Sequence, residues 1–451
     1  MLLTFKHSKH QRHLAQLPKI PQTVTDIKIL YSPEDFYYAL IQAIAVAKQR
    51  IYLVALYLEQ DQGGQRILEA VYNAKRNDSS LDIAILVDWH RAQRNRIGAA
   101  FSYTNADWYC HMAQANPGVE VPVYGVPVNT REILGVLHLK GFIIDTKVIY
   151  SGANLNNVYL HQQDKYRYDR YRIIHNRLLA DTLLTYIKQH ILTAPAVNRL
   201  DNIARPKSLK IKNDTRLFRQ TLREADYFYQ GEAGPNELAI TPLVGLGKQS
   251  LLNKTIHHLF CSTRDTLTLC TPYFNLPALL VRDLINILRL GRQVEIIVGN
   301  KIANDFYIPE DQPFKIIGLL PYLYEINLRR FFCRLQQYVD NGQLVLRLWK
   351  DNGNSYHLKG VWVDKEWQLL TGNNLNPRAW RLDLENALLI HDPTLALNLQ
   401  HEKELNRIRT HTQILRHFTE LENIVDYPFK VRKLIRRLRR IRIDLLISRI
   451  L

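Results

Sequence analysis

The sequence has 451 residues, of which 46% are hydrophobic and 23% are charged, as in a globular protein with two domains. Its four cysteines are scattered without a CxxC motif or a His–Cys cluster, and no window approaches the roughly 18 apolar residues of a membrane span. We therefore expect no disulfide framework, zinc site or transmembrane helix. The net charge of +18 predicts an anionic partner: nucleic acid, an anionic membrane surface or a phosphorylated substrate.

The first predicted elements form a strand–helix–strand unit. Residues 49–59 (QRIYLVALYLE) and 81–89 (LDIAILVDW) are apolar runs of strand length, and residues 67–76 (ILEAVYNAKR) between them have helical periodicity. The same order returns in the second half of the chain, in residues 265–274 (DTLTLCTPYF), 280–292 (LVRDLINILRLGR) and 293–301 (QVEIIVGNK).

Each unit leads to a shared motif. Residues 138–145 read HLKGFIID and residues 357–364 read HLKGVWVD, and each is followed by a strand that ends in Gly-x-Asn-Leu-Asn, at residues 148–156 and 367–376. Element order and motif together indicate an internal repeat. We predict an α/β fold of two α/β/α sandwiches, each on a mixed sheet, which pack about a pseudo-twofold axis and bring equivalent strand ends together.

A polar segment, residues 199–216, is the predicted linker between the halves. The expected domains are residues 1–205 and 206–395, followed by a C-terminal helical extension at residues 396–451. Its last part, residues 427–451, reads as a basic amphipathic helix because apolar residues recur at helical spacing among arginines and lysines.

This basic helix is the predicted membrane-binding element. Such a helix can lie in a lipid interface with its cations at the phosphates of an anionic phospholipid membrane. The alternative is a helix docked on the protein with solvated arginines, and adsorption to ribosomes or nucleic acid would be incidental. The predicted membrane-binding residues are Lys430, Arg432, Lys433, Arg436, Arg437, Arg439, Arg440 and Arg442.

The repeated His-x-Lys pairs carry the candidate chemistry. One such pair on an amphipathic strand is most often a solvated face, but two equivalent copies favour one active site assembled from both. One imidazole could attack phosphorus while the other serves as general acid and base. No carboxylate cluster predicts a divalent metal, and no cofactor is expected. The candidates are His138 and His357 for the chemistry, and Lys140, Lys359, Asn154 and Asn374 for the phosphate oxygens.

An attacking histidine needs an acceptor at its other ring nitrogen, which fixes the reactive tautomer. Glu385 and Asp169 open the probable strands that follow the two motifs, and we predict that they orient the histidines. The rival interpretation of each is an ordinary salt bridge.

These residues resemble a known family. HLKGFIID with SGANLN, and HLKGVWVD with TGNNLN, are similar to the two HxKx4D motifs of the phospholipase D superfamily. Segments along the whole chain, such as LVDWHRAQR, DKYRYDRY, TPYFNLPA, NDFYIPED and KVRKLIRRLRRIRID, are similar to the bacterial phosphatidylserine synthases of that superfamily. The family motif adds Asp145 and Asp364 to the expected catalytic residues.

The resemblance implies CDP-diacylglycerol–serine O-phosphatidyltransferase activity, in which CDP-diacylglycerol and L-serine give phosphatidylserine and CMP through a phosphatidyl-enzyme. It also implies a cytoplasmic enzyme associated peripherally with the inner face of the cytoplasmic membrane. The rivals are a cardiolipin synthase or phospholipase D-type transferase and, from another class, a phosphodiesterase nuclease. The sequence does not decide which histidine attacks; we favour His138 and treat the two as a coupled pair.

Further substrate contacts are predicted where strands end at the ligand-binding edge of an α/β sheet. One group follows the strand at residues 81–89 and is a candidate for holding the CDP moiety; helix capping and surface roles are the alternative. Tyr273 lies at the matching edge of the second half and could stack on cytosine or line the lipid pocket. The candidates for holding the CDP moiety, in and after the strand at residues 81–89, are Asp88, His90, Arg91 and Arg94.

Overall fold

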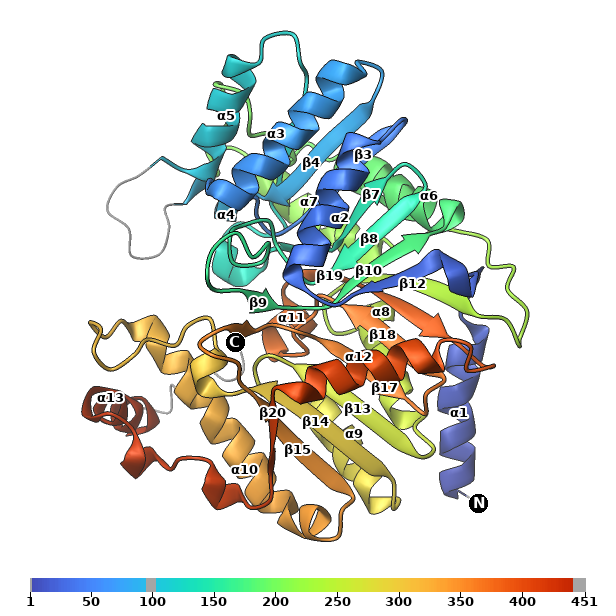
Figure 1. Ribbon diagram of the computed structural model, residues 1–451, viewed down its shortest axis with the longest axis vertical. Coiled ribbons are helices and arrows are strands. Elements are labelled where there is room, and N and C mark those ends of the chain that lie inside the picture. Colours follow the sequence, from blue (N-terminus) through green and yellow to red (C-terminus); the bar gives the residue numbers. More distant parts are fainter. Residues whose placement is uncertain (1, 95–102, 441–451) are drawn as a thin grey trace.

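The computed structural model describes residues 2–94 and 103–440. Within these ranges the first half forms an eight-stranded mixed sheet with the order β11-β5-β4-β3-β7-β8-β10-β2 (Figure 1). β3, β4 and β5 are parallel, whereas β7, β8 and β10 run antiparallel to their neighbours. The strands are β2 (Ile27–Leu30), β3 (Arg50–Val54), β4 (Asp82–Asp88), β5 (Val123–Val126), β7 (Gly141–Ile144), β8 (Lys147–Ser151), β10 (Tyr171–His175) and β11 (Asn198–Arg199).

The second half repeats this topology. Its central order β15-β14-β13-β17-β18-β19 matches β5-β4-β3-β7-β8-β10, which confirms the predicted repeat. β12 and β1 extend the sheet beside β19, and β20 extends it beside β15. The strands are β1 (Ile20–Pro21), β12 (Ala239–Leu246), β13 (Thr266–Thr271), β14 (Gln293–Gly299), β15 (Leu344–Trp349), β17 (Gly360–Val363), β18 (Trp367–Thr371), β19 (Leu384–His391) and β20 (Thr412–Leu415).

Helices cover both faces of each sheet, as predicted for α/β/α sandwiches. α2, α3 and α5 pack on one face of the first sheet, and α6 and α7 lie on the other. α8, α9 and α10 cover one face of the second sheet, and α12 lies on its other face (Figure 1). The helices are α1 (Leu2–Gln16), α2 (Pro33–Ala45), α3 (Gln62–Asn77), α4 (Trp89–Gln93), α5 (Asn105–Ala115), α6 (Arg177–Tyr186), α7 (Lys212–Glu224), α8 (Leu251–Cys261), α9 (Ala278–Arg289), α10 (Leu320–Asp340), α11 (Pro377–Arg381), α12 (Asn398–Thr410) and α13 (Phe429–Arg440).

One hydrophobic core belongs to both halves. Ile143 and Tyr150 of the first sheet lie in the same buried cluster as Leu370 and Leu388 of the second. An apolar interface resists relative motion of the two parts that it joins. The interface between the two halves, which we call the seam, can therefore hold a site built from both.

Two terminal segments depart from the expected layout. α1 packs on α8, and β1 pairs with β12, so the N-terminal segment lies with the second sheet. Residues 397–426 were expected to be helical, but they contain β20, which pairs with β15 and covers an otherwise open sheet edge. The helical expectation is wrong for that strand, and the proposed domain boundaries stay a prediction.

A buried ion-pair network ties α12 to the first half. The Glu404 carboxylate accepts from Arg170 Nε at 2.9 Å and from Arg172 Nη2 at 2.6 Å. Burial alone would raise the pKa of Glu404, but the two arginines outweigh it and lower that pKa to about 2.

Replacing Glu404 with alanine leaves two buried guanidinium groups without their carboxylate. We expect Glu404→Ala to lower the free energy of unfolding by about 3–5 kcal/mol, measured by urea denaturation. Glu402→Ala on the same helix removes an exposed carboxylate and is the matched control. Equal shifts of the two midpoints would contradict the assignment.

Candidate active site

The two histidines lie where short strands cross between the halves. β6 (Leu137–His138) pairs with β19, so that His138 stands opposite Glu385. β16 (Ser355–Tyr356), which ends directly before His357, pairs with β9 (Arg167–Tyr168) of the first half. The pairings are reciprocal, as the predicted pseudo-twofold axis requires, and they place each motif against a strand of the other half.

The predicted orienting carboxylates lie beside the histidines, but each contacts the ring of the other half. His138 Nδ1 is 2.9 Å from both carboxylate oxygens of Glu385. His357 Nδ1 is 2.9 Å from Asp169 Oδ2. With Nδ1–H donating to a carboxylate, Nε2 of each ring keeps its lone pair for chemistry.

The lysines also cross the seam. A Cβ added at Gly372 would lie 2.6 Å from Lys140 Cγ, and one added at Gly152 would lie 3.0 Å from Lys359 Nζ. Each lysine therefore runs along the Gly-x-Asn turn of the other half, where a larger residue would meet its side chain. The lysine contact explains the glycine at position 372, whereas at Gly152 an added Cβ would also lie 2.8 Å from both carboxylate oxygens of Asp169.

The two motifs share one electrostatic environment. Burial lowers the pKa of His138 well below its usual range, and Lys140, Lys359 and His357 add to the effect. Burial and Lys359 lower the pKa of His357 to about 4 and that of Lys140 to about 7. Both imidazoles are therefore neutral near pH 7, and His138 and Lys140 of the first motif are close enough to the second motif to respond to its charge.

The two carboxylates differ in their basicity. Burial and Asp383 raise the pKa of Glu385 well above its usual range. Burial also favours the protonated form of Asp169, but Lys359 and the hydrogen bond from His357 outweigh it and lower the pKa of Asp169. Asp169 is thus ionised at neutral pH, whereas Glu385 is a comparatively basic carboxyl group.

The two asparagines predicted to hold phosphate have different surroundings. Asn154 Oδ1 accepts from Lys140 Nζ at 2.6 Å and from the backbone N–H of Leu56 at 3.1 Å, so it positions the lysine. Asn374 Oδ1 is buried and has no hydrogen-bond partner among the described residues. Phosphate binding by either amide stays a prediction.

Asp145 and Asp364 are not brought to the histidines, and their assignment as catalytic residues is corrected. Each follows the strand that leads away from its histidine, with a φ of 52°. Asp145 accepts from the backbone N–H groups of residues 48–50, and Asp364 does the same for residues 264–266. These aspartates fix the starts of β3 and β13.

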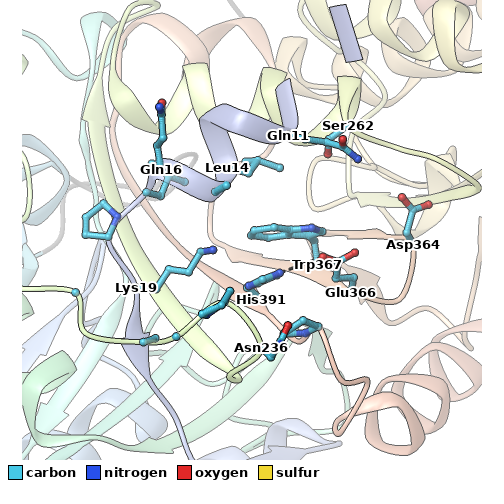
Figure 2. Close-up of a pocket in the computed structure, with 18 of the residues that line it drawn as sticks. Gln11, Leu14, Gln16, Lys19, Asn236, Ser262, Asp364, Glu366, Trp367 and His391 are labelled. Atoms are coloured by element: carbon cyan, nitrogen blue, oxygen red, sulfur yellow. Dashed lines mark hydrogen bonds and ion pairs between the residues drawn. The ribbon is translucent and has the colours of Figure 1, made fainter. Parts of the chain in front are cut away.

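A cavity of about 680 Å³ lies at the Asp364 end of the second sheet (Figure 2). There the rings of Trp367 and His391 stack at 4.0 Å. His391 ends β19, at whose other end Glu385 lies, and six extended residues span roughly 20 Å. This cavity is therefore separate from the histidine pair.

The residues predicted to hold CDP lie at the end of β4 in the first half and after it. Asp88 accepts from the backbone N–H groups of His90 and Arg91 and, at 2.9 Å, from that of Leu137 next to His138. Its role is to cap α4 and to position β6. The Arg91 guanidinium lies 4.7 Å from the centre of the Tyr57 ring.

His90 and Arg94 contact the segment between β5 and β6. His90 Nε2 is 2.7 Å from the carbonyl oxygen of Asn129, and Arg94 Nε is 2.6 Å from Glu132. Contact of His90, Arg91 or Arg94 with the nucleotide stays a prediction.

Tyr273 is buried beside the second motif. Its ring meets the His357 ring edge-on at 6.2 Å and stacks on Tyr324 at 5.2 Å. Tyr324 covers one face of the Tyr273 ring. The position of Tyr273 therefore suits lining the space beside His357 better than stacking freely on a nucleotide base. Tyr57 is the equivalent residue of the first half, because it follows the start of β3 by as many residues as Tyr273 follows the start of β13.

Sequence reasoning missed two features beside His357. The Tyr159 hydroxyl lies 3.0 Å from His357 Nδ1, and Arg167 forms an ion pair with Asp305 at 3.1 Å. The repeat gave no signal for Tyr159, because Ala379 stands at its place in the second copy.

One group of possible metal ligands occurs in the described part of the chain, away from the histidine pair. Ligand atoms of His10 on α1 and of His257 and Cys261 on α8 lie within 4.8 Å of one another. The prediction that the chain has no zinc site therefore stays a prediction. His257 and Cys261 lie four residues apart on α8, but His10 comes from a distant part of the sequence, so residue spacing shows only part of the group.

The basic helix α13 is docked on the protein through its apolar stripe. Val431 and Ile435 are buried in a cluster with Tyr322 and Ile326 of α10. The apolar face is thus covered, while Lys433, Arg436, Arg437 and Arg440 are among its exposed basic residues. Arg442 lies outside the described residues. Among the described helices, none has the length and apolar character needed to cross a membrane.

The corrected role of Asp364 can be tested by separating stability from activity. Asp364→Ala leaves three backbone N–H groups without their acceptor, so we expect the free energy of unfolding to fall by about 1–3 kcal/mol. Well below the unfolding temperature, kcat and KM should stay near those of the parent. Asp265→Ala, an exposed neighbour, is the control, and a large loss of kcat at full folding would contradict the correction.

Comparisons with known proteins agree with this geometry. Residues 256–409 match the family model described as cardiolipin synthase, PLD-like domain. A crystal structure of the phosphatidylserine synthase of Haemophilus influenzae Rd KW20 superposes with a TM-score of 0.95 at 48% identity, covering 99% of this chain and 100% of that one.

Curated relatives extend over the whole chain. A CDP-diacylglycerol–serine O-phosphatidyltransferase of Escherichia coli (strain K12) is 68% identical over 451 residues, with 100% of both chains covered. The enzyme of that name from Haemophilus influenzae is 49% identical over 455 residues, again with 100% of both covered. A CDP-diacylglycerol–glycerol-3-phosphate 3-phosphatidyltransferase of Saccharomyces cerevisiae is 26% identical over 86% of this chain and 82% of its own. The family resemblance seen in the sequence is confirmed: the chain belongs to the bacterial phosphatidylserine synthases with phospholipase D-like domains.

Proposed function

We propose that this chain transfers the phosphatidyl group of CDP-diacylglycerol to the hydroxyl of L-serine, with release of CMP, through a phosphatidyl-histidine intermediate. The observation that supports this mechanism best is the pair of buried imidazoles, His138 and His357, each held at Nδ1 by a carboxylate of the other half. Their Nε2 atoms are then the available nucleophile and base.

In the first step Nε2 of one histidine, for which we favour His138, bonds to the phosphatidyl phosphorus as the P–O bond to CMP breaks. CMP leaves as a phosphate monoester with a second pKa of about 6, so it needs little help from an acid. As positive charge develops on the ring, its Nδ1 proton moves toward Glu385, whose raised pKa makes it a suitable acceptor.

In the second step the serine hydroxyl oxygen attacks phosphorus and the N–P bond breaks. The hydroxyl proton passes to Nε2 of His357, which is neutral at rest because its pKa is lowered. The ionised carboxylate of Asp169 then stabilises the imidazolium. Lys140 and Lys359 offset the charge on the non-bridging oxygens throughout.

We also propose that the enzyme works at the inner face of an anionic membrane. The exposed cations of α13 support this, and because Val431 and Ile435 are buried, the attraction would be mainly electrostatic. Adsorption to ribosomes or nucleic acid through the same cations would be incidental.

The histidine roles predict different partial reactions. His357→Ala should still release about one equivalent of CMP in a burst, while phosphatidylserine formation falls by roughly 100- to 10,000-fold because serine has lost its base. His138→Ala should lose both. Quenched-flow measurements with CDP-diacylglycerol in mixed micelles, without added metal, give both quantities. A burst slowed as much as turnover in His357→Ala would refute the division of roles.

The same assay separates the rival functions. Glycerol, glycerol 3-phosphate and water replace serine as acceptors, and plasmid DNA is added in parallel. Serine-dependent CMP release is expected. Preference for a glycerol acceptor would point to another phosphatidyltransferase, and DNA cleavage with inert lipid would point to a nuclease.

The membrane proposal predicts a charge-dependent loss of binding. Replacing Lys433, Arg436 and Arg437 with glutamine should weaken binding to vesicles rich in phosphatidylglycerol by about tenfold or more, and 0.5 M salt, roughly, should abolish the difference. The control replaces three exposed linker lysines, Lys207, Lys210 and Lys212. Equal loss in both triple variants, measured by sedimentation, would refute a specific role for α13.

A further inference from the structure

A charged pair beside His357 takes no part in the mechanism above. Asp305 follows the short turn of 3-10 helix at Lys301–Ala303 in the second half, and Arg167 opens β9 in the first. Arg167 Nη1 lies 3.1 Å from Asp305 Oδ2, so the pair spans the seam. β9 pairs with β16, the strand that ends directly before His357.

A chain of contacts joins this pair to the reacting centre. The Arg167 guanidinium lies 4.7 Å from the centre of the Tyr159 ring, and the hydroxyl of that tyrosine lies 3.0 Å from His357 Nδ1. Burial and Lys359 lower the pKa of His357, and the Asp305 carboxylate acts against them. Asp305 is therefore within electrostatic reach of the imidazole that would deprotonate serine.

Arg167 contacts only one of the two carboxylate oxygens of Asp305. Its side chain is 12% exposed, yet its Oδ1 atom is buried and has no hydrogen-bond partner among the described residues. A buried carboxylate oxygen without a donor is destabilising, so Asp305 Oδ1 can accept a hydrogen bond from a bound ligand or a water. A carboxylate selects a cationic donor, because hydrogen bonds between charged groups are the strong ones.

We propose that Asp305 binds the ammonium group of the acceptor amino acid, with the Arg167 guanidinium beside it for the carboxylate of the same molecule. This inference rests on the proposed transferase function and names the subsite that selects serine. A zwitterion needs an anion and a cation a few ångströms apart, and the pair supplies both. The serine hydroxyl is then directed toward His357, the base of the second step.

The test uses a variant that keeps the shape of the pair. Asp305→Asn retains an oxygen acceptor for Arg167 but loses the negative charge. We expect the KM for serine to rise by about 10- to 100-fold, whereas serine-independent exchange of labelled CMP into CDP-diacylglycerol stays within about twofold of the parent. The preference for serine over 3-hydroxypropionate, which lacks the ammonium group, should fall by a similar factor. Asp311→Asn, an exposed carboxylate in the same segment, is the matched control.

Two results would overturn the proposal. An unchanged KM for serine in Asp305→Asn would show that the carboxylate does not meet the acceptor. A parallel loss of CMP exchange and transfer would show that it acts on the histidines or on folding instead. If the parent enzyme itself releases no CMP in response to serine, the proposed function fails and this inference fails with it.

Discussion

Two hydrogen bonds across the seam between the halves, from His138 to Glu385 and from His357 to Asp169, hold the candidate active site together. Each bond joins a histidine to a carboxylate of the opposite half, so neither half can form a competent imidazole alone. The backbone pairings β6 with β19 and β16 with β9 bring the partners together. The shared hydrophobic core in turn keeps those pairings in register.

Burial of this assembly determines its charge. Two imidazoles and two lysines lie together in a site with little solvent, and desolvation lowers the pKa of all four groups. A site of this kind favours an anionic phosphate group, whose negative charge stabilises the protonated form of the lysines. In the proposed mechanism, this burial accounts both for the attraction of the substrate phosphate and for the neutral state of the attacking imidazole.

The internal repeat made much of the fold and of the candidate site predictable, because a feature present twice at equivalent positions is hard to attribute to chance. It revealed the strand–helix–strand unit of each half, the histidine and lysine pairs, and the two carboxylates. It did not reveal that the carboxylates cross between the halves, since spacing along the chain is silent on which copy a strand meets. Tyr159 gave no signal because the second copy has Ala379 at the equivalent position. Asp305 lies in the segment NDFYIPED, which carries the family resemblance, but the repeat gives it no role.

The wrong assignments also have physical causes. Asp145 and Asp364 belong to the family motif, but a motif does not say that β7 and β17 carry them to the far end of the sheet. The amphipathic pattern of α13 correctly predicted a helix, and its apolar stripe packs on α10. Membrane binding by its basic residues stays a prediction.

The most direct test of the crossed arrangement is a nitrogen-15 spectrum of the histidine rings in carboxylate variants. The account predicts that Glu385→Gln changes the tautomer signals of His138 alone, and that Asp169→Asn changes those of His357 alone. If each substitution instead altered the ring of its own half, the two halves would each carry a separate site and the shared centre would be refuted.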